Sequence, residues 1–325
     1  MTDCGCCQDG GCGSSERWVA PRRAEPLAGV IVVDKPGGMT SHDVVDAVRR
    51  MTGQRKVGHA GTLDPMATGV LVVCLGQATR LAEYLMAGRK QYSARFELGT
   101  TTDTYDAEGN VVNSDGRTDF CLEEIDAALS VFRGPIEQIP PMFSALKRDG
   151  QPLYKLARQG KVVERPPRRV HIYELVLVDW SKPCLTVEVV CSSGTYIRSL
   201  AHDLGQHLGG GAHLTSLVRL ASSGFSLEDA VSLDRLEEAF RNGQDYCYLL
   251  PPDEALIGWP AMVADSANAR RIKHGGSVEA DPPPRDPNGL THLRAYDMDG
   301  EFLAVMTYDP TAERWRPTKV FSPAP

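Results

Sequence analysis

Apolar side chains recur along the first 250 residues with two different periods, which predict alternating strands and helices. An apolar run at 29–33 predicts a short strand that ends at a turn containing Pro36 and two glycines. A second run predicts a strand at 70–75. The segment 90–98 alternates strictly, with Tyr92 on its apolar face, and therefore predicts a strand with one buried side. Two more strands are expected at 170–179 and 185–191.

Apolar positions three or four residues apart predict helices between these strands. Ser41 is a suitable N-cap for the first helix, and Gly53 is expected to end it. Thr195 is the expected N-cap of the last helix. The helical segments predicted in this way are 44–51, 78–85, 122–132 and 197–208.

The composition divides the chain into three predicted regions. Residues 1–26 are rich in Gly and Cys and predict a disordered tail, whereas 27–250 carry the strand and helix patterns. From about Pro251 the chain turns Pro-rich, and short alternations at 292–296 and 302–307 predict a small β-rich domain at 251–325. We therefore predict an α+β fold with a mixed, largely antiparallel central sheet flanked by helices and loops.

The composition of the 325 residues is that of a globular protein, with 42% hydrophobic and 24% charged residues. No apolar run approaches the length of a membrane helix, and the amino terminus lacks the pattern of a signal peptide, so a cytoplasmic protein is expected. Four of the nine cysteines lie within the first twelve residues, but they lack the paired spacing of a zinc knuckle. We therefore predict no metal site.

The local distribution of charge points to a different partner than the net charge of −7 does. An acidic protein is a poor partner for nucleic acid, yet residues 147–169 hold eight cations and only two carboxylates. A solvated charged loop would have the same composition. The alternative is an element that binds phosphates, with its cations at Lys147, Arg148, Lys155, Arg158, Lys161, Arg165, Arg168 and Arg169.

The stretch 57–70 is the strongest candidate for chemistry. It places Asp64 between closely spaced glycines, and Pro65 biases the aspartate toward an extended backbone, so the carboxylate is expected to project into a groove. The order Gly58-His59-Ala60-Gly61-Thr62-Leu63-Asp64-Pro65 resembles the catalytic motif of the TruB-type tRNA pseudouridine synthases. An Asp-Pro turn leading into a strand is the structural alternative.

Other segments resemble motifs of the same family. They are the Lys35-Pro36 turn, the Lys-x-Tyr strand with Tyr92, the segment Thr102–Gly109 and the sequence Gly194-Thr195-Tyr196-Ile197-Arg198. Arg198 is expected in the first turn of a helix, where a cation opposes the helix dipole and so suggests an anionic partner. Asp103 and Asp106 could suggest a metal site, but turn-capping roles are preferred because no further ligand lies at suitable spacing.

The resemblance implies isomerisation of uridine 55 in the T-loop of tRNA to pseudouridine, without a cofactor. It implies Asp64 as the nucleophile, Tyr92 as the side chain that holds the base, and Arg198 as the partner that keeps Asp64 ionised and lowers its pKa. Attack on C6 of the base and attack on C1′ both remain open. The implied substrate-binding residues are His59, which wedges into the T-loop, and Tyr196, Leu217, Lys35, Lys147, Lys155, Arg158 and Lys161. The small C-terminal region would be a PUA-like RNA-binding module.

Two other functions remain open from the sequence. A noncatalytic tRNA-binding or tRNA-folding protein could use the same groove, although binding alone does not require Asp64, Tyr92 and Arg198 together. A guide-RNA-dependent relative that acts on ribosomal RNA is the second alternative, and the insertion at about 138–169, which resembles the stand-alone bacterial type, argues against it. We expect a monomer that binds the T-arm of tRNA, contacts no membrane and needs no obligatory protein partner.

Overall fold

The computed structural model describes residues 26–144, 146–148, 150–157, 159–161, 163–280 and 292–321. The predicted disordered tail at 1–26 and its cysteines therefore lie almost entirely outside the described residues. Within them, no helix is both long enough and apolar enough to cross a membrane.

A large mixed sheet forms the centre of the fold. In the described residues it is a 10-stranded sheet with the order β14-β1-β3-β12-β4-β11-β10-β7, and β2 and β13 pair at its margins with β3 and β12. The strands are β1 (Gly29–Lys35), β2 (Val57–His59), β3 (Thr68–Leu75), β4 (Lys90–Leu98), β7 (Gly134–Gln138), β10 (Arg168–Ser181), β11 (Cys184–Cys191), β12 (Ala212–Ser222), β13 (Phe225–Ser226) and β14 (Val231–Ser232).

The pairing confirms the predicted fold class. The pairs β1 with β14 and β3 with β12 are parallel, and all the others in this sheet are antiparallel. All five predicted strands of the first 250 residues occur, as β1, β3, β4, β10 and β11. The alternation in β4 is also confirmed, because the residues from Lys90 to Leu98 alternate between buried and more exposed positions.

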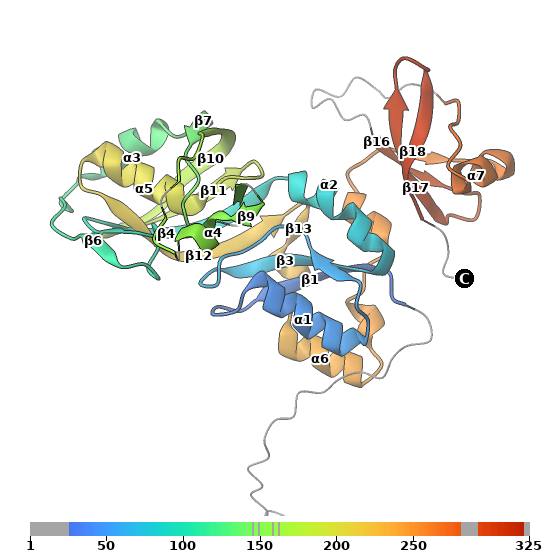
Figure 1. Cartoon of the computed structure of the whole chain (residues 1–325), viewed down its shortest axis with the longest axis horizontal. Coiled ribbons are helices and arrows are strands. Elements are labelled where there is room, and N and C mark those ends of the chain that lie inside the picture. Colours follow the sequence, from blue (N-terminus) through green and yellow to red (C-terminus); the bar gives the residue numbers. More distant parts are fainter. Residues whose placement is uncertain are drawn as a thin grey trace, which may run out of the picture.

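Helices cover the two ends of this sheet differently, as Figure 1 shows. One face of β1 and β3 packs against α1 (Ser41–Thr52) and α6 (Leu233–Arg241), which lie side by side. The opposite face packs on the 3₁₀ helix η1 (Gly76–Leu81) and on α2 (Ala82–Ala87). Both faces of these strands are therefore buried, which explains why their sequences are unbroken apolar runs.

At the other end of the sheet, helices of the described residues cover one face only. There α3 (Leu122–Ser130) and α5 (Ile197–Leu208) pack against β4, β10, β11 and β12. On the uncovered face of β10, Val176 and Val178 are more than half exposed. The remaining short elements of the first 250 residues are β5 (Thr101–Thr102), β6 (Val111–Asn113), β8 (Lys147–Arg148), β9 (Gln151–Pro152), α4 (Leu153–Ala157), η2 (Leu227–Asp229) and η3 (Asp245–Cys247).

Two predictions of helix caps were wrong, and one predicted helix has a mixed form. Thr40, not Ser41, caps α1: its side chain accepts a hydrogen bond from the backbone of Asp43, which completes a capping box. Thr195 does not cap α5, because its hydroxyl donates to the Ser192 carbonyl and Tyr196 occupies the N-cap position. The helix predicted at 78–85 occurs, with its first part as the 3₁₀ helix η1 and its second part as the short α2.

A smaller sheet lies at the carboxyl end of the described chain. It has the order β15-β16-β17-β18, with β15 (Ala261–Val263), β16 (His292–Tyr296), β17 (Phe302–Asp309) and β18 (Arg314–Val320), and it follows η4 (Pro252–Leu256) and α7 (Ser266–Lys273). Its Trp315 is almost completely buried. The β-rich character predicted for this region is therefore confirmed, whereas the domain boundary at 251 stays a prediction.

The two sheets share an apolar cluster. Val305 and Phe321 from the smaller sheet and its end pack in the same cluster as Val30 and Val72 of the large sheet. Next to this cluster, the Arg80 guanidinium of η1 donates to the Val320 carbonyl at 2.5 Å. The small sheet is therefore fixed against the layer that carries β3.

Gly205 in α5 offers a test of the close packing between α5 and β12. Alanine at a helix interior normally stabilises by about 1 kcal/mol relative to glycine. Here an added Cβ would collide with the backbone of Gly211 and Ala212, so we expect Gly205→Ala to lower the free energy of unfolding by about 1–3 kcal/mol. Urea denaturation of Gly205→Ala beside Gln206→Ala, an exposed neighbour, measures this. Equal stability of the two variants would contradict the packing described here.

Candidate active site

Asp64 lies in the loop between β2 and β3, and the Lys35 side chain of β1 binds backbone carbonyls next to this loop. The Lys35 ammonium is fully buried and donates to the carbonyls of Pro36, Met39 and Pro65 at 2.8, 2.7 and 3.2 Å. Burial lowers the pKa of Lys35 to about 8, partly opposed by the charge of Asp64. Because its three N–H groups are used in this way, Lys35 supports the loop and is not placed to bind a substrate.

Two further side chains fix the loop on either side of Asp64. The buried Ser41 hydroxyl accepts from the Leu63 amide at 2.8 Å and donates to the Leu63 carbonyl at 3.2 Å. Arg219 of β12 is also buried, and its guanidinium donates to the carbonyls of Gly61 and Val70 at 3.1 and 2.6 Å. The loop is therefore tied to α1 before Asp64 and to β12 at both of its ends.

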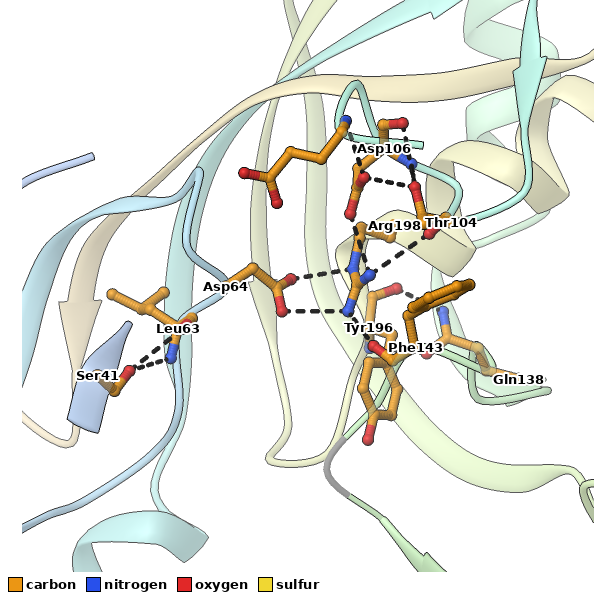
Figure 2. Close-up of polar contacts among 10 residues, drawn as sticks. Ser41, Leu63, Asp64, Thr104, Asp106, Gln138, Phe143, Tyr196 and Arg198 are labelled. Atoms are coloured by element: carbon orange, nitrogen blue, oxygen red, sulfur yellow. Dashed lines mark hydrogen bonds and ion pairs between the residues drawn. The ribbon is translucent and has the colours of Figure 1, made fainter. Parts of the chain in front are cut away.

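Arg198 of α5 makes a two-pronged contact with Asp64, as Figure 2 shows. Its Nε lies 2.9 Å from one carboxylate oxygen of Asp64, and its Nη2 donates to the other at 3.1 Å. The Arg198 side chain is 6% exposed, whereas 32% of the Asp64 side chain is exposed. The predicted pairing is present in the structure, and Asp64 keeps one side open to solvent.

The other donors of Arg198 bind the segment 104–106 and Phe143. Its Nη1 donates to the Asp106 carboxylate at 3.0 Å and to the Thr104 carbonyl at 3.4 Å, and its Nη2 also donates to the Phe143 carbonyl at 3.0 Å. Asp106 is itself buried and accepts from the Thr104 hydroxyl and the Glu108 amide. The predicted turn-forming role of Asp106 is therefore only half of its function, because it also fixes Arg198.

The electrostatics of Asp64 differ from the expectation. Burial raises the pKa of the Asp64 carboxyl above its ordinary value, and the neighbouring Asp106 raises it further, while Arg198 and Lys35 act in the opposite direction. Arg198 lowers this pKa, as expected, but the net shift of the pKa is upward. Loss of water around the carboxylate outweighs the attraction of Arg198, which is shared with Asp106.

Tyr92 of β4 lies beneath the Asp64 loop. It is 7% exposed, pairs in register with Arg219 of β12, and packs in the same apolar cluster as Leu63 and Leu217. Burial raises the pKa of the Tyr92 hydroxyl, so this group stays protonated at neutral pH. Tyr92 and the buried Leu217 therefore pack in one cluster with Leu63, the residue before Asp64.

Tyr196 and His59 lie on opposite sides of Asp64 in the chain. Tyr196 forms the N-cap of α5, and its backbone exchanges hydrogen bonds of 2.8 and 2.9 Å with the Gln138 side chain. His59 ends β2 and is partly buried. Burial lowers the pKa of His59, and Arg219 lowers it further, so its ring is neutral at physiological pH.

The predicted basic insertion is described in part. Lys155 and Lys161 are exposed, and Lys147 belongs to β8. Arg158 lies outside the described residues. Arg165 donates to the Pro140 carbonyl at 3.0 Å, which ties the end of the insertion to the segment preceding it. Among the described residues, no group of three or more His, Cys, Asp or Glu side chains is arranged to hold a metal ion.

Sequence reasoning missed three residues of this site. Ser41 was interpreted as a helix cap, Asp106 as a turn residue, and Arg219 was not singled out. The sequence held a signal for Arg219. It lies two residues after the apolar Leu217, so both side chains lie on the same, buried face of β12. An arginine at an inward position of a strand needs polar partners, and here the partners are backbone carbonyls of the Asp64 loop.

Comparison with known proteins places the chain in a family. Residues 49–197 match the model of the TruB family pseudouridylate synthase N-terminal domain, and residues 198–257 match that of the tRNA pseudouridylate synthase B C-terminal domain. The tRNA pseudouridine synthase B of Pseudomonas aeruginosa is 43% identical over 282 residues, which are 86% of this chain and 91% of the relative. The chain belongs to the TruB family. The tRNA pseudouridine synthase B of Geobacter sulfurreducens is 47% identical over 249 residues, which are 77% of this chain and 82% of that relative.

Solved structures support the same fold for this TruB-family chain. A Cbf5-Nop10-Gar1 complex contains a chain that matches with a TM-score of 0.67 and 26% identity, covering 86% of this chain and 78% of that one. The archaeal box H/ACA sRNP Nop10-Cbf5 complex matches with a TM-score of 0.68 and 25% identity, covering 91% and 86%. The TruB-type resemblance seen in the sequence is therefore confirmed.

Replacing Asp106 tests the electrostatics of the TruB-family site. Asp106→Asn removes one of the two carboxylates that fix Arg198, so we expect turnover to fall by about 100-fold through misplacement of Arg198. The same change removes a charge that raises the pKa of Asp64. Activity that needs ionised Asp64 is lost as the pH falls through this pKa, so the acid limb of the pH–rate profile should move to lower pH.

The control is Asp103→Asn, which changes an exposed aspartate of the same loop whose carboxylate accepts only from Asn110 among the described contacts. It should leave both the rate and the acid limb unchanged. An Asp106→Asn protein with the wild-type profile would show that Arg198 does not need its second carboxylate.

Proposed function

We propose that this chain isomerises uridine 55 in the T-loop of tRNA to pseudouridine, with Asp64 as the nucleophile and without a cofactor. Relatives at 42–47% identity over most of the chain are tRNA pseudouridine synthases, which supports the reaction class. The observation that carries the assignment is a carboxylate, partly open to solvent, that a buried arginine holds with two hydrogen bonds.

The geometry of Asp64 fits the demands of the reaction. The N1–C1′ bond must break, the uracil must turn, C5 must bond to C1′ and lose its proton, and N1 must gain one. A nucleophile that adds and later leaves can hold the intermediate, either through C6 of the base or through C1′. Arg198 aims the carboxylate, and its own orientation is fixed by Asp106 and by the Thr104 and Phe143 carbonyls.

Tyr92 and Leu217 supply the apolar floor for the base in this proposal. Their location beneath the Asp64 loop supports stacking of the uracil on the tyrosine ring. The raised pKa of Tyr92 keeps its hydroxyl neutral, which favours a stacking role over unaided removal of the C5 proton. Tyr196, next to Arg198 at the start of α5, is the proposed second contact to the nucleotide.

Access to the uridine requires that the base leaves the folded T-loop. Flipping a stacked base costs a few kcal/mol, which protein contacts must offset. We assign His59 to the space in the T-loop that the flipped base leaves. Its neutral, partly exposed ring at the end of β2 can stack on the neighbouring RNA bases. The exposed Lys155 and Lys161, together with Lys147 and Arg158, would bind phosphates of the T-arm.

A tRNA-folding role is compatible with the same surface and can coexist with catalysis. Catalysis gives a reason for placing the buried Arg198 and Asp106 beside the partly exposed Asp64, which RNA binding alone does not require. Dependence on a guide RNA is disfavoured, because the relative named tRNA pseudouridine synthase B is 43% identical to this chain, whereas the Cbf5 complex matches at 26%. We propose that the protein acts as a monomer without an obligatory protein partner.

Asp64→Asn decides whether the carboxylate performs the chemistry. The change keeps the shape of the side chain but removes its charge and most of its nucleophilicity, so pseudouridine formation should vanish while tRNA binding remains. Arg198→Lys should lower turnover by at least about 100-fold, since an ammonium cannot reproduce the two-pronged contact. The measurement is single-turnover pseudouridine formation on an unmodified tRNA transcript, beside equilibrium binding.

Position mapping on the same transcript tests the choice of uridine, and a tRNA lacking the T-loop uridine serves as the control. Wild-type turnover by Asp64→Asn would remove the catalytic assignment. A wild-type protein that binds and refolds tRNA without forming pseudouridine would establish the folding role alone.

The insertion is tested by replacing Lys155, Arg158 and Lys161 together with alanine. If they displace counterions from phosphates, tRNA affinity should fall and the slope of log K against log salt should drop by about 2–3. Turnover of saturated complex should survive. The control replaces three cations on other elements, Arg55, Lys182 and Arg235, and should leave affinity unchanged. Equal affinities and salt slopes for the two triple variants would identify the insertion as a solvated loop.

A further inference from the structure

The loop that carries Asp106 contains an unusual backbone turn immediately before it. Tyr105 has a φ of 67°, in the left-handed region that residues other than glycine rarely adopt. This turn directs the Asp106 carboxylate toward Arg198, while the backbone on both sides is tied to β12. The Leu214 amide donates to the Tyr105 carbonyl at 3.0 Å, and the Ala107 amide donates to the Leu214 carbonyl at 2.9 Å.

The Tyr105 ring has a specific partner on α5. It stacks on the His202 ring with centroids 3.9 Å apart and an angle of 16° between the planes. His202 lies one helical turn after Arg198, so both side chains point to the same side of α5. One side of the helix therefore contacts adjacent residues of the loop twice, through Arg198 to Asp106 and through His202 to Tyr105.

No hydrogen bond within the described chain explains the position of His202. Its Nδ1 is buried and has no partner among the described residues. Burial lowers the pKa of His202, so the ring is neutral at physiological pH and can lie flat on the phenol ring without a charge to solvate. The stack with Tyr105 is therefore the contact that joins the His202 side chain to the loop that carries Asp106.

We propose that His202 is a positioning residue for catalysis: its stack on Tyr105 holds the left-handed turn that presents Asp106 to Arg198 and thereby aims Asp64. This inference rests on the proposed function. The path runs through contacts of the structure, from the stacked rings to the Tyr105 backbone, then to the Asp106–Arg198 pair and to Asp64.

The kinetic test compares His202→Ala, which removes the stack, with His202→Phe, which keeps an aromatic ring. His202→Ala should lower single-turnover pseudouridine formation by about tenfold, because small misplacements of catalytic groups are costly, and change the Kd for tRNA by less than about twofold. His202→Phe should stay within about threefold of wild type. The matched control is His171→Ala, which breaks another His–Tyr stack, with Tyr173 on β10, and should leave the rate unchanged.

Coupling to Tyr105 separates positioning from general stability. Tyr105→Gly removes the ring but tolerates a positive φ, so adding His202→Ala to it should cause no further loss of rate, whereas independent effects would multiply. A further loss of about tenfold in that background, a wild-type rate for His202→Ala, or a loss that follows tRNA affinity would each overturn the proposal.

Hydrogen exchange provides a readout that does not depend on activity. Amides of residues 100–113 should exchange faster in His202→Ala than in wild type or in His202→Phe, with no change in β10 or β11. If wild type forms no pseudouridine but this pattern occurs, the proposed function fails and the positioning of the loop by His202 stands. Unchanged exchange in this segment would refute the positioning role itself.

Discussion

The site depends on one guanidinium group that is shared between two carboxylates. Arg198 uses its Nε and both Nη atoms on Asp64, Asp106 and two backbone carbonyls, so the arginine has one orientation. Burying such a charge is costly unless it is fully paired, and here the pairing comes from separate parts of the chain. The loop after β5 supplies Asp106, and the segment after β7 supplies the Phe143 carbonyl.

The backbone around Asp64 is fixed by side chains that bind backbone atoms of the loop and not the Asp64 carboxylate. Lys35, Ser41 and Arg219 bind carbonyls or amides of the loop from β1, α1 and β12. The carboxylate is therefore positioned from one side by its backbone and from the other by Arg198. Because about a third of its side chain stays exposed, it remains accessible to a reacting group.

Periodicity predicted five of the ten strands of the main sheet, β1, β3, β4, β10 and β11, and the family resemblance implied the pairing of Asp64 with Arg198. The strands were predictable because their burial follows the local pattern of side chains, as in β4. Errors occurred where a tertiary contact competes with a local one. Ser41 has the chemistry of a helix cap, yet it bonds to Leu63, which is 22 residues away, and Asp106 has the chemistry of a turn residue, yet it also pairs with Arg198. Such choices depend on which elements meet in three dimensions.

The apolar cluster that joins the two sheets has a consequence for recognition. Phe321 and Val305 pack with Val30 and Val72, and β3, which contains Val72, directly follows the Asp64 loop. The small sheet and the Asp64 loop are therefore both joined to the layer that contains β3. An RNA that contacted both the small sheet and Asp64 would have to span the separation that this packing sets. Substrates could then be selected by the spacing between two parts of a folded RNA, in addition to the bases around the uridine.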